Sequence, residues 1–249
     1  MLLHLGPLGD DEAFELSIAH ALLRRAGAGE LDEALRVYRP AGPAVVFGRR
    51  DTRLPGYPAA VAAAHEAGFG TAVRAVGGRA VAYTREAVVV DHVRAEAQSP
   101  ASMDRRFEDF GRRFAALFGD LGIDARVGPV PGEYCPGAHS VNARDEVKLV
   151  GTAQRVLPRA WLFSSLVNVG DRDRVSAVLA DVYGALDLPF DPASVGTLQS
   201  EAGTGADEVL AAVLRAWDAD PQQAVEVDRD TLDRAALLEP DHRTPAVPK

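Results

Sequence analysis

The hydrophobic positions recur at two spacings along the chain, one typical of helices and one of strands. A spacing of three or four residues gives the segment 12–26 one apolar face, with Asp10 and Asp11 ahead of it as candidate N-caps. The segment 102–121 repeats this spacing with aromatic residues and predicts a strongly amphipathic helix. Further helices are predicted over 58–67, 171–186, 207–219 and 228–239.

Segments rich in β-branched and aromatic residues predict strands between these helices. They are 35–40, 44–50, 71–76, 79–84, 87–93, 125–128, 139–143, 147–156 and 160–169. We expect a tight turn between the first two strands and a polar turn at 144–146. Mixed strands with helices beside them predict an α+β core over residues 1–190.

The composition changes after Pro189. Residues 190–205 are rich in glycine, serine and threonine, which predicts a loop, and the tail 241–249 is expected to be loose. We therefore expect a core domain over 1–190 and a C-terminal loop and helical extension over 191–249.

Composition and charge narrow the class of protein. With 47% hydrophobic and 25% charged residues, the chain can bury a sizeable core, and its formal charge of −9 argues against a nucleic-acid binder. The single cysteine excludes an internal disulfide and zinc sites built from several thiolates. We see neither a signal-peptide pattern nor an apolar run of membrane-spanning length, so we expect a cytoplasmic protein that does not bind membranes.

The single cysteine, Cys135, lies in the stretch PVPGEYCPGAHS. Two prolines and two glycines close to it predict a constrained loop rather than a regular element. A structural cysteine normally fills an apolar core, whereas a nucleophile is presented on a loop near positive charge or backbone donors. The spacing alone leaves both interpretations open.

Two further features bear on the candidate chemistry. Lys148, in the following strand, is either a solvated lysine or one that reaches back to favour a thiolate and donate to an acyl oxygen. Gly77 and Gly78, in VRAVGGRAVAYT, form either a hairpin or bulge, or a backbone that passes close to a ligand.

Other polar residues give weaker signals. His139 is a candidate general base or an ordinary turn residue, and Asp91 and His92 at a strand end are ambiguous. The histidines show no metal-ligand spacing, so we predict no metal site. Five arginines could gather near a site mouth to receive an acidic partner or could simply be solvated: Arg49, Arg50, Arg53, Arg79 and Arg155.

A family resemblance is carried by residues 133–155, which contain YCPG, then SVN, then K-x-x-G-x-A-Q-R, and by the glycine stretch RAVGGRAV. These motifs resemble the cysteine-dependent octanoyl/lipoyl transferases of the lipoate-ligase-like superfamily. The similarity spans about residues 12–200. It is greatest to the amidotransferase branch, which moves an acyl group from the glycine cleavage H protein to other lipoyl domains.

The resemblance implies a lipoate/biotin-ligase-like α+β catalytic domain with mixed sheets flanked by helices. Cys135 would be the nucleophile that accepts the acyl group, and Lys148 would bind the acyl carbonyl. Arg74, Gly77 and Gly78 would line the acyl pocket, with Gly151 and Gln154 supporting the lysine strand. The acyl group would pass to Cys135 as a thioester and then to a lysine amine, with no ATP or other cofactor. The implied partners are lipoyl-domain proteins, namely the H protein and E2 subunits of 2-oxoacid dehydrogenases, with acyl carrier protein as a further candidate donor.

One departure bears on the alternatives. ATP-dependent lipoate ligases of this superfamily usually carry two arginines before a triple glycine and a histidine after it. The corresponding places here hold Val73, Arg74, Gly77, Gly78, Arg79 and Tyr83. Three hypotheses remain: a cysteine acyltransferase, an ATP-dependent ligase, and a non-catalytic module that binds acylated proteins.

Overall fold

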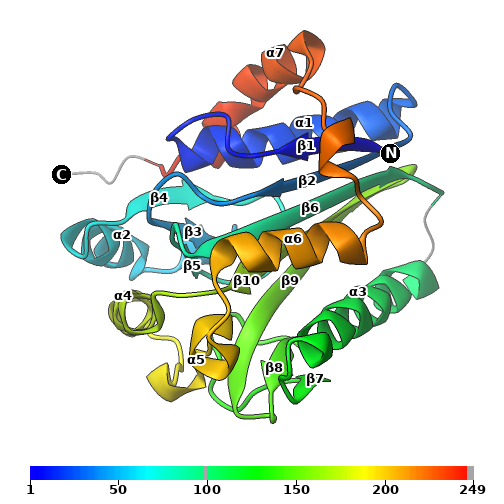
Figure 1. Cartoon of the computed structure of the whole chain (residues 1–249). Helices are drawn as coiled ribbons and strands as arrows, with labels where there is room; N and C mark the ends of the chain where they lie inside the picture. Colours follow the sequence, from blue (N-terminus) through cyan, green and yellow to red (C-terminus); the bar gives the residue numbers. More distant parts are fainter. Residues whose placement is uncertain (98–99, 246–249) are drawn as a thin grey trace.

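Two β-sheets form the centre of the protein in a computed structural model, which describes residues 1–97 and 100–245 (Figure 1). The large sheet has seven strands in the order β1 (Leu2–Leu5), β2 (Glu33–Tyr38), β6 (Ala87–Ala95), β10 (Ala160–Asn168), β9 (Val147–Leu157), β8 (Val141–Ala143) and β7 (Ala125–Val127). The small sheet has the order β4 (Gly70–Val73), β3 (Ala44–Phe47) and β5 (Val81–Tyr83).

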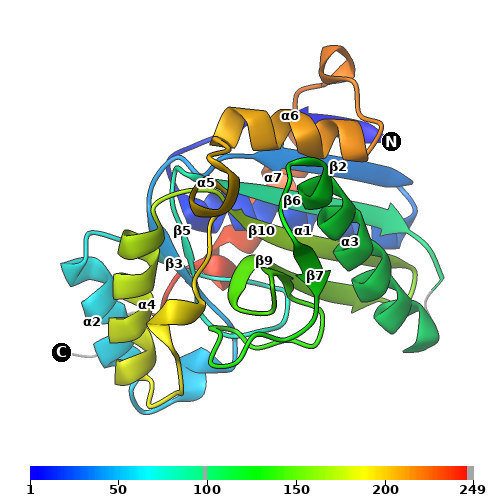
Figure 2. The same ribbon diagram turned by 60° about the horizontal axis from the view of Figure 1, so that its bottom comes forward.

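Helices cover both faces of the large sheet (Figure 2). One face packs against α1 (Glu12–Ala28), which is itself covered by α7 (Arg229–Leu238), and the other face packs against α3 (Pro100–Asp120) and α6 (Ala206–Ala216). The pair α2 (Tyr57–Glu66) and α4 (Arg172–Ala185) packs against the small sheet. The short α5 (Leu198–Ala202) precedes α6 and corrects the prediction of a loop over 190–205, because Thr197 caps this single helical stretch. The mixed sheets flanked by helices agree with the predicted α+β class.

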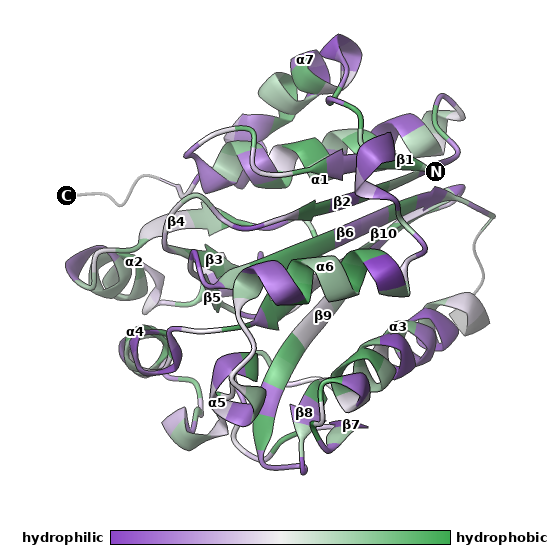
Figure 3. Cartoon of the chain, in the orientation of Figure 1, coloured by the Kyte–Doolittle hydropathy of each residue, from purple (hydrophilic) through white to green (hydrophobic). Residues whose placement is uncertain are grey.

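The residues of β6, an interior strand of the large sheet, show why helices cover both faces of that sheet. Val88 and Val90 lie in the core beneath α3 and α6, whereas Val93 lies in the core beneath α1. A strand that is buried on both faces reads as a nearly continuous apolar run, which is the pattern of residues 87–93. In Figure 3, β6 and β10 are accordingly mostly green, whereas the helices alternate green with purple.

Strand pairing corrects two expectations. Residues 35–40 and 44–50 contain strands, but β2 belongs to the large sheet and β3 to the small one, so residues 39–43 cross between sheets instead of forming a tight turn within one. Gly77 and Gly78 form neither a hairpin nor a bulge, because β3 lies between β4 and β5. The segment 74–80 is instead a loop that crosses the end of β3.

The C-terminal segment is integrated with the rest of the chain. Val209 and Val213 of α6 lie in the same core as Phe110 of α3, and Ala235 of α7 lies in the core around α1. The expectation of a loose tail is wrong for 241–245, since His242 is fully buried and Arg243 bridges to Ala72 of β4. Residues 246–249 lie outside the described part. Within the described residues, no helix is both long and apolar enough to cross a membrane.

Candidate active site

Cys135 projects its thiol from a loop that the surrounding structure holds rigidly. Its backbone has φ 43°, in the left-handed region, and its N–H donates to the Tyr183 hydroxyl at 2.6 Å. The Tyr183 hydroxyl donates in turn to the carbonyl of Ala80, at the start of β5. The preceding residue, Tyr134, is buried and accepts a hydrogen bond from Asn168 of β10. The thiol is therefore fixed relative to both sheets.

Two donors point at the sulfur. The backbone N–H of Arg79 lies 3.2 Å from Cys135 Sγ, and the Nη2 atom of Arg74 lies 3.3 Å from it. Burial alone would raise the pKa of the thiol, because the thiolate loses its solvation. The charges of Arg74 and Lys148, together with these two hydrogen bonds, outweigh burial and lower the pKa below its ordinary value. A thiol with a lowered pKa forms the nucleophilic thiolate at a lower pH than an ordinary cysteine does.

The segment 74–80, called the glycine loop below, approaches the sulfur so closely that Gly78 has no room for a side chain. Gly78 has φ +105°, and a Cβ atom there would lie 2.7 Å from Cys135 Sγ and would also overlap the Arg74 guanidinium. A Cβ atom on Gly77 would meet no atom within 4 Å. The two glycines therefore have different roles, although they are adjacent in sequence.

Asp51 holds the glycine loop from behind. This fully buried carboxylate accepts the N–H of Gly48 at 2.9 Å and pairs with Arg79 at 3.1 Å. A Cβ atom on Gly48 would overlap the carbonyl of Gly78, so the turn after β3 and the glycine loop are in backbone contact. The segment FGRRD thus positions the N–H group that points at the sulfur.

Lys148 reaches back to the cysteine loop. Its side chain is buried, and its Nζ atom donates to the carbonyls of Tyr134 at 3.0 Å and of Cys135 at 2.9 Å. The third partner is the carboxylate of Glu133, at 2.9 Å. A Cβ atom on Gly151 would lie 3.4 Å from Lys148 Cε, which is an ordinary van der Waals contact, so Gly151 lies directly beside the lysine stem on β9.

Glu133 is a site residue that sequence reasoning missed. It is buried, and besides Lys148 it accepts the Ser140 hydroxyl at 2.7 Å and the Gly137 N–H at 3.2 Å. These bonds close the loop 133–140 on itself. A buried lysine needs a counter-charge, but the sequence does not show that Lys148 is buried, so the need for Glu133 was not visible. Tyr183 and Asp51 were missed because their partners at the site, Cys135 and Arg79, lie far from them in the sequence.

A cavity of about 450 Å³ opens beside the sulfur. Cys135 and Lys148 both line it, together with Gly77, Gly78 and Gln154. Much of the remaining wall is apolar and comes from α3, the cysteine loop and β9: Met103, Phe107, Pro136, Ala138 and Ala153. The cavity therefore joins the thiol of Cys135 to a partly apolar space.

Gln154 and His139 complete the wall. The Gln154 amide accepts from Arg106 Nε and donates to the Met103 carbonyl, both at 3.0 Å, which ties β9 to α3. The His139 ring stacks on Phe107, with the ring centroids 5.4 Å apart. Both side chains are thus held against α3 at the cavity.

The remaining polar candidates lie in different places. Arg155 donates to the Ala75 carbonyl of the glycine loop, and burial followed by the charge of Arg49 lowers its pKa. Arg50 and Arg53 are exposed on the turn that follows β3. His92 bonds Glu33, and burial raises the pKa of Asp91, but neither residue lines the cysteine cavity. Among the described residues, no cluster of histidine, cysteine and carboxylate side chains could hold a metal.

A family model described as the lipoyl protein ligase A/B catalytic domain matches residues 11–216. The chain belongs to this family. Octanoyl-(GcvH):protein N-octanoyltransferase of Geobacillus kaustophilus is 28% identical over 152 residues, which make up 61% of this chain and 53% of that protein. The protein of the same name from Anoxybacillus flavithermus is 28% identical over 151 residues, with the same coverage. The chain thus spans about half the length of the curated relatives it matches.

Solved structures of the family share the fold. Lipoate-protein ligase A bound with ATP superposes with a TM-score of 0.76 at 21% identity, covering 96% of this chain and 95% of that chain. A bipartite lipoate protein ligase from Thermoplasma acidophilum, described with its E2 lipoyl domain, gives a TM-score of 0.69 at 19% identity, covering 96% and 91%. The predicted lipoate-ligase-like α+β fold is therefore confirmed.

Proposed function

We propose that the protein is an acyltransferase that moves an octanoyl or lipoyl group between proteins through a thioester on Cys135. The observation that carries the proposal is the placement of the sulfur. It lies at the wall of a partly apolar cavity, with Arg74 Nη2 and the Arg79 N–H both directed at it. An ATP-dependent ligase has no evident use for such a thiolate, because an acyl-adenylate is already activated.

The proposed reaction has two half-reactions, one that transfers the acyl group to Cys135 and one that transfers it from Cys135 to an acceptor lysine. In the first, the thiolate attacks the carbonyl carbon of an acylated lysine on the donor, the S–C bond forms, and the C–N bond breaks as the departing amine takes up a proton. In the second, the deprotonated amine of an acceptor lysine attacks the thioester, an amide forms, and the amine proton is released as the thiolate leaves. The thioester keeps the acyl group activated while one protein replaces the other.

The cavity supplies binding for the acyl chain. Each methylene that moves from water to an apolar wall contributes about 0.8 kcal/mol. Phe107, Ala138 and Ala153 offer such a wall. We assign Gly77, Gly78 and Gln154 to the wall of the acyl pocket and Gly151 to the support of the lysine strand. Arg74, which was expected to line the pocket, is not among the residues that line the cavity, and we assign it to the thiolate beside the pocket.

Lys148 acts on the thiolate through its charge and on the cysteine loop through its hydrogen bonds. A contact with the acyl oxygen requires its ammonium to exchange one of its three present acceptors, of which the Cys135 carbonyl belongs to the nucleophile itself. We propose that this exchange accompanies acyl binding.

The comparisons support a choice of partners. The curated relatives carry the name of a transferase that uses octanoyl-GcvH, and one structural relative is described with an E2 lipoyl domain. We propose the glycine cleavage H protein as donor and E2 lipoyl domains as acceptors, with acyl carrier protein to be tested beside it as donor. Because the chain carries a formal charge of −9, an acidic partner needs local arginines such as Arg49 and Arg155 near the mouth.

The deciding experiment uses octanoylated H protein, the intact chain and mass spectrometry. Wild-type protein should gain one octanoyl group that hydroxylamine removes, and this group should then pass to an E2 lipoyl domain. Cys135→Ser should form no thioester and transfer nothing, with circular dichroism as the control for folding. Transfer by Cys135→Ser at the wild-type rate would overturn the proposal.

The ligase alternative is favoured only by the fold, which this chain shares with an ATP-bound ligase. It predicts lipoyl-adenylate from free lipoate and ATP, without any need for Cys135. A non-catalytic binding module instead predicts that the acylated partner binds without turnover and that Cys135 resists alkylation at neutral pH.

A further inference from the structure

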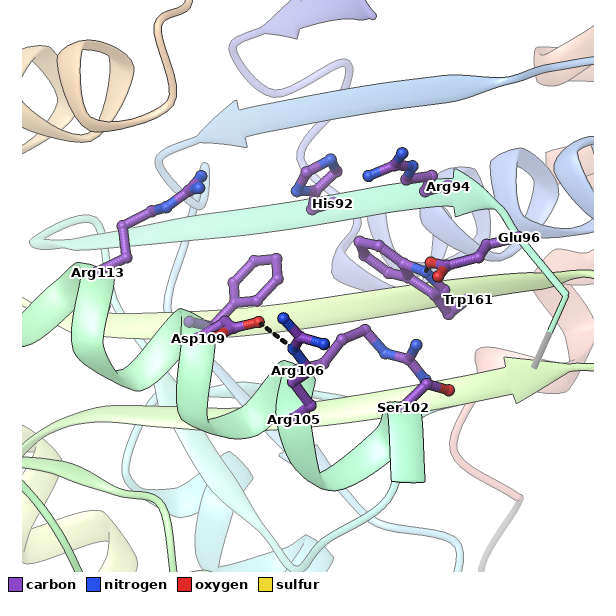
Figure 4. A pocket seen from close by; sticks show the side chains of 10 residues that line it. His92, Arg94, Glu96, Ser102, Arg105, Arg106, Asp109, Arg113 and Trp161 are labelled. Atoms are coloured by element: carbon purple, nitrogen blue, oxygen red, sulfur yellow. Dashed lines mark hydrogen bonds and ion pairs between the residues drawn. The ribbon is translucent and has the colours of Figure 1, made fainter. Parts of the chain in front are cut away.

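A second cavity, of about 490 Å³, lies along a neighbouring face of α3 (Figure 4). Its lining from α3 is the stripe Ser102, Arg105, Arg106, Asp109, Phe110 and Arg113, whereas Met103, Asp104 and Phe107 line the cysteine cavity. The opposite wall comes from β6 and β10, through His92, Arg94 and Trp161. Its lining shares no residue with the cysteine cavity, so it is a separate space.

Positive charge dominates this second cavity. Four arginines line it, Arg94, Arg105, Arg106 and Arg113, against two carboxylates, Glu96 and Asp109. Both carboxylates have other partners, since Glu96 accepts the Trp161 indole N–H and Asp109 pairs with Arg112 at 2.7 Å. Asp109 also forms an ion pair with Arg105, in which Oδ2 lies 3.8 Å from Nε; this pair is drawn in Figure 4. The cavity therefore has an excess of cationic side chains.

Arg106 is the most buried of the four arginines that line this cavity. The residue is only 7% exposed, its Nε donates to Gln154, and its guanidinium lies over the Trp161 ring at 5.1 Å. These two contacts fix the orientation of the side chain. Its Nη2 atom is buried and has no hydrogen-bond partner among the residues that the structure describes. A buried cationic donor without an acceptor is costly, and such groups in native proteins call for an explanation.

We infer that this cavity is a binding site for a small organic phosphate, with Arg106 as its anchoring residue. Guanidinium groups bind phosphate oxygens in pairs, and several arginines suit a group that carries more than one negative charge. The cavity is larger than inorganic phosphate alone requires, and Phe110 and Trp161 provide an apolar floor for the attached organic group. This site does not depend on the acyl-transfer proposal.

Phenyl phosphate is a suitable probe because it joins a phosphate to a small apolar ring. The two tryptophans of the chain report on this site: Trp161 lines it, and Trp217 contacts Phe110 and lies beneath the Arg113 guanidinium. Titration of the full-length protein should give a saturable change in tryptophan fluorescence. Phenol should give none, and benzoate should bind more weakly than phenyl phosphate because it carries a single charge.

Matched variants locate the binding. Arg106→Met should weaken phenyl phosphate binding about tenfold or more, since a lost hydrogen bond to a charged group has that effect. Arg229→Gln should bind like wild type, because Arg229 is exposed on α7, does not line the cavity and pairs with Asp233, which does not line it either. Should Arg106→Met fail to fold, the exposed Arg94→Gln serves in its place and should weaken binding several-fold.

Two results would overturn the inference. One is the absence of saturable binding by wild type, or binding by Arg106→Met (or its substitute Arg94→Gln) that is as tight as binding by the control Arg229→Gln. The other is protection of Cys135 from iodoacetamide by phenyl phosphate, which would place the probe in the cysteine cavity. An unchanged alkylation rate together with weaker binding by the variant supports the second site, whatever the outcome of the acyl-transfer experiment.

Discussion

Adding a single methyl group to the glycine loop tests how the site activates its thiol. In Gly78→Ala the new Cβ atom would lie 2.7 Å from Cys135 Sγ and would overlap the Arg74 guanidinium, so at least one of these groups must move. The φ angle of +105° adds strain of about 1–3 kcal/mol for a residue with a side chain. Gly77→Ala is the matched control, because its Cβ atom meets nothing within 4 Å.

The expected change in the pKa of Cys135 follows from the hydrogen bond that this movement breaks. A hydrogen bond to a charged group contributes about 1.5–3 kcal/mol, and one pKa unit corresponds to about 1.4 kcal/mol. Loss of the contact between Arg74 and Sγ should therefore raise the pKa of Cys135 by about one to two pH units in Gly78→Ala. The sign is upward because the guanidinium stabilises the thiolate and not the neutral thiol.

The assay is the pH dependence of iodoacetamide alkylation, which reports on one site because the chain has a single cysteine. Wild type and Gly77→Ala should share a midpoint below that of an ordinary thiol, and the midpoint of Gly78→Ala should lie higher. Identical midpoints for the two glycine variants would refute the view that the close approach at Gly78 sets the reactivity of Cys135.

Three further predictions concern the unfolding free energy measured with urea. Glu133→Gln leaves the buried Lys148 without its carboxylate at 2.9 Å and should cost about 3–5 kcal/mol; adding Lys148→Met should recover part of this loss, and purely additive losses would contradict a coupled pair. Tyr183→Phe leaves the Cys135 N–H without its acceptor and should cost about 1–3 kcal/mol, so an unchanged value would count against this contact. Burial lowers the pKa of His20 to about 3, and burial also lowers the pKa of its hydrogen-bonded neighbour His242, so the folded state favours neutral rings. Their contribution is present above the unfolded pKa of about 6.5 and is lost as the pH falls toward the folded pKa. Between about pH 7.5 and pH 5, wild type should lose about 2 kcal/mol more than His20→Gln, and equal losses would show that the His20 ring is not held neutral.

Local pattern predicted most of the elements because helix and strand periodicity depend on neighbouring residues. The aromatic spacing of 102–121 corresponds to α3, and the apolar run 87–93 corresponds to β6. Pairing between strands was less accessible. Residues 35–50 do contain two strands, yet a sequence that alternates correctly says nothing about whether its strands share a sheet, and here they do not.

The site likewise contains residues that the sequence revealed and residues that it did not. The motifs around Cys135, Lys148 and Gly78 were visible in the sequence, and the structure brings all three to one cavity. The burial of Lys148 was not visible, because a lysine in a strand with the same alternation can equally face water. Glu133, Asp51 and Tyr183 therefore had no signal that distinguished them from other polar residues.

By itself, then, the amino-acid sequence determined most of the helices and strands, though not β1 or α5, together with the loop that carries the single cysteine and the resemblance to the lipoate-ligase-like superfamily. Only the tertiary structure decided that the Arg79 N–H and the Arg74 guanidinium meet at the sulfur, that Glu133 neutralises Lys148, and that a second, arginine-lined cavity follows the neighbouring face of α3. The physical reason is the separation along the chain of the residues that interact. Periodicity acts between residues a few positions apart, whereas hydrogen bonds, counter-charges and cavities depend on residues that only the folded chain brings together.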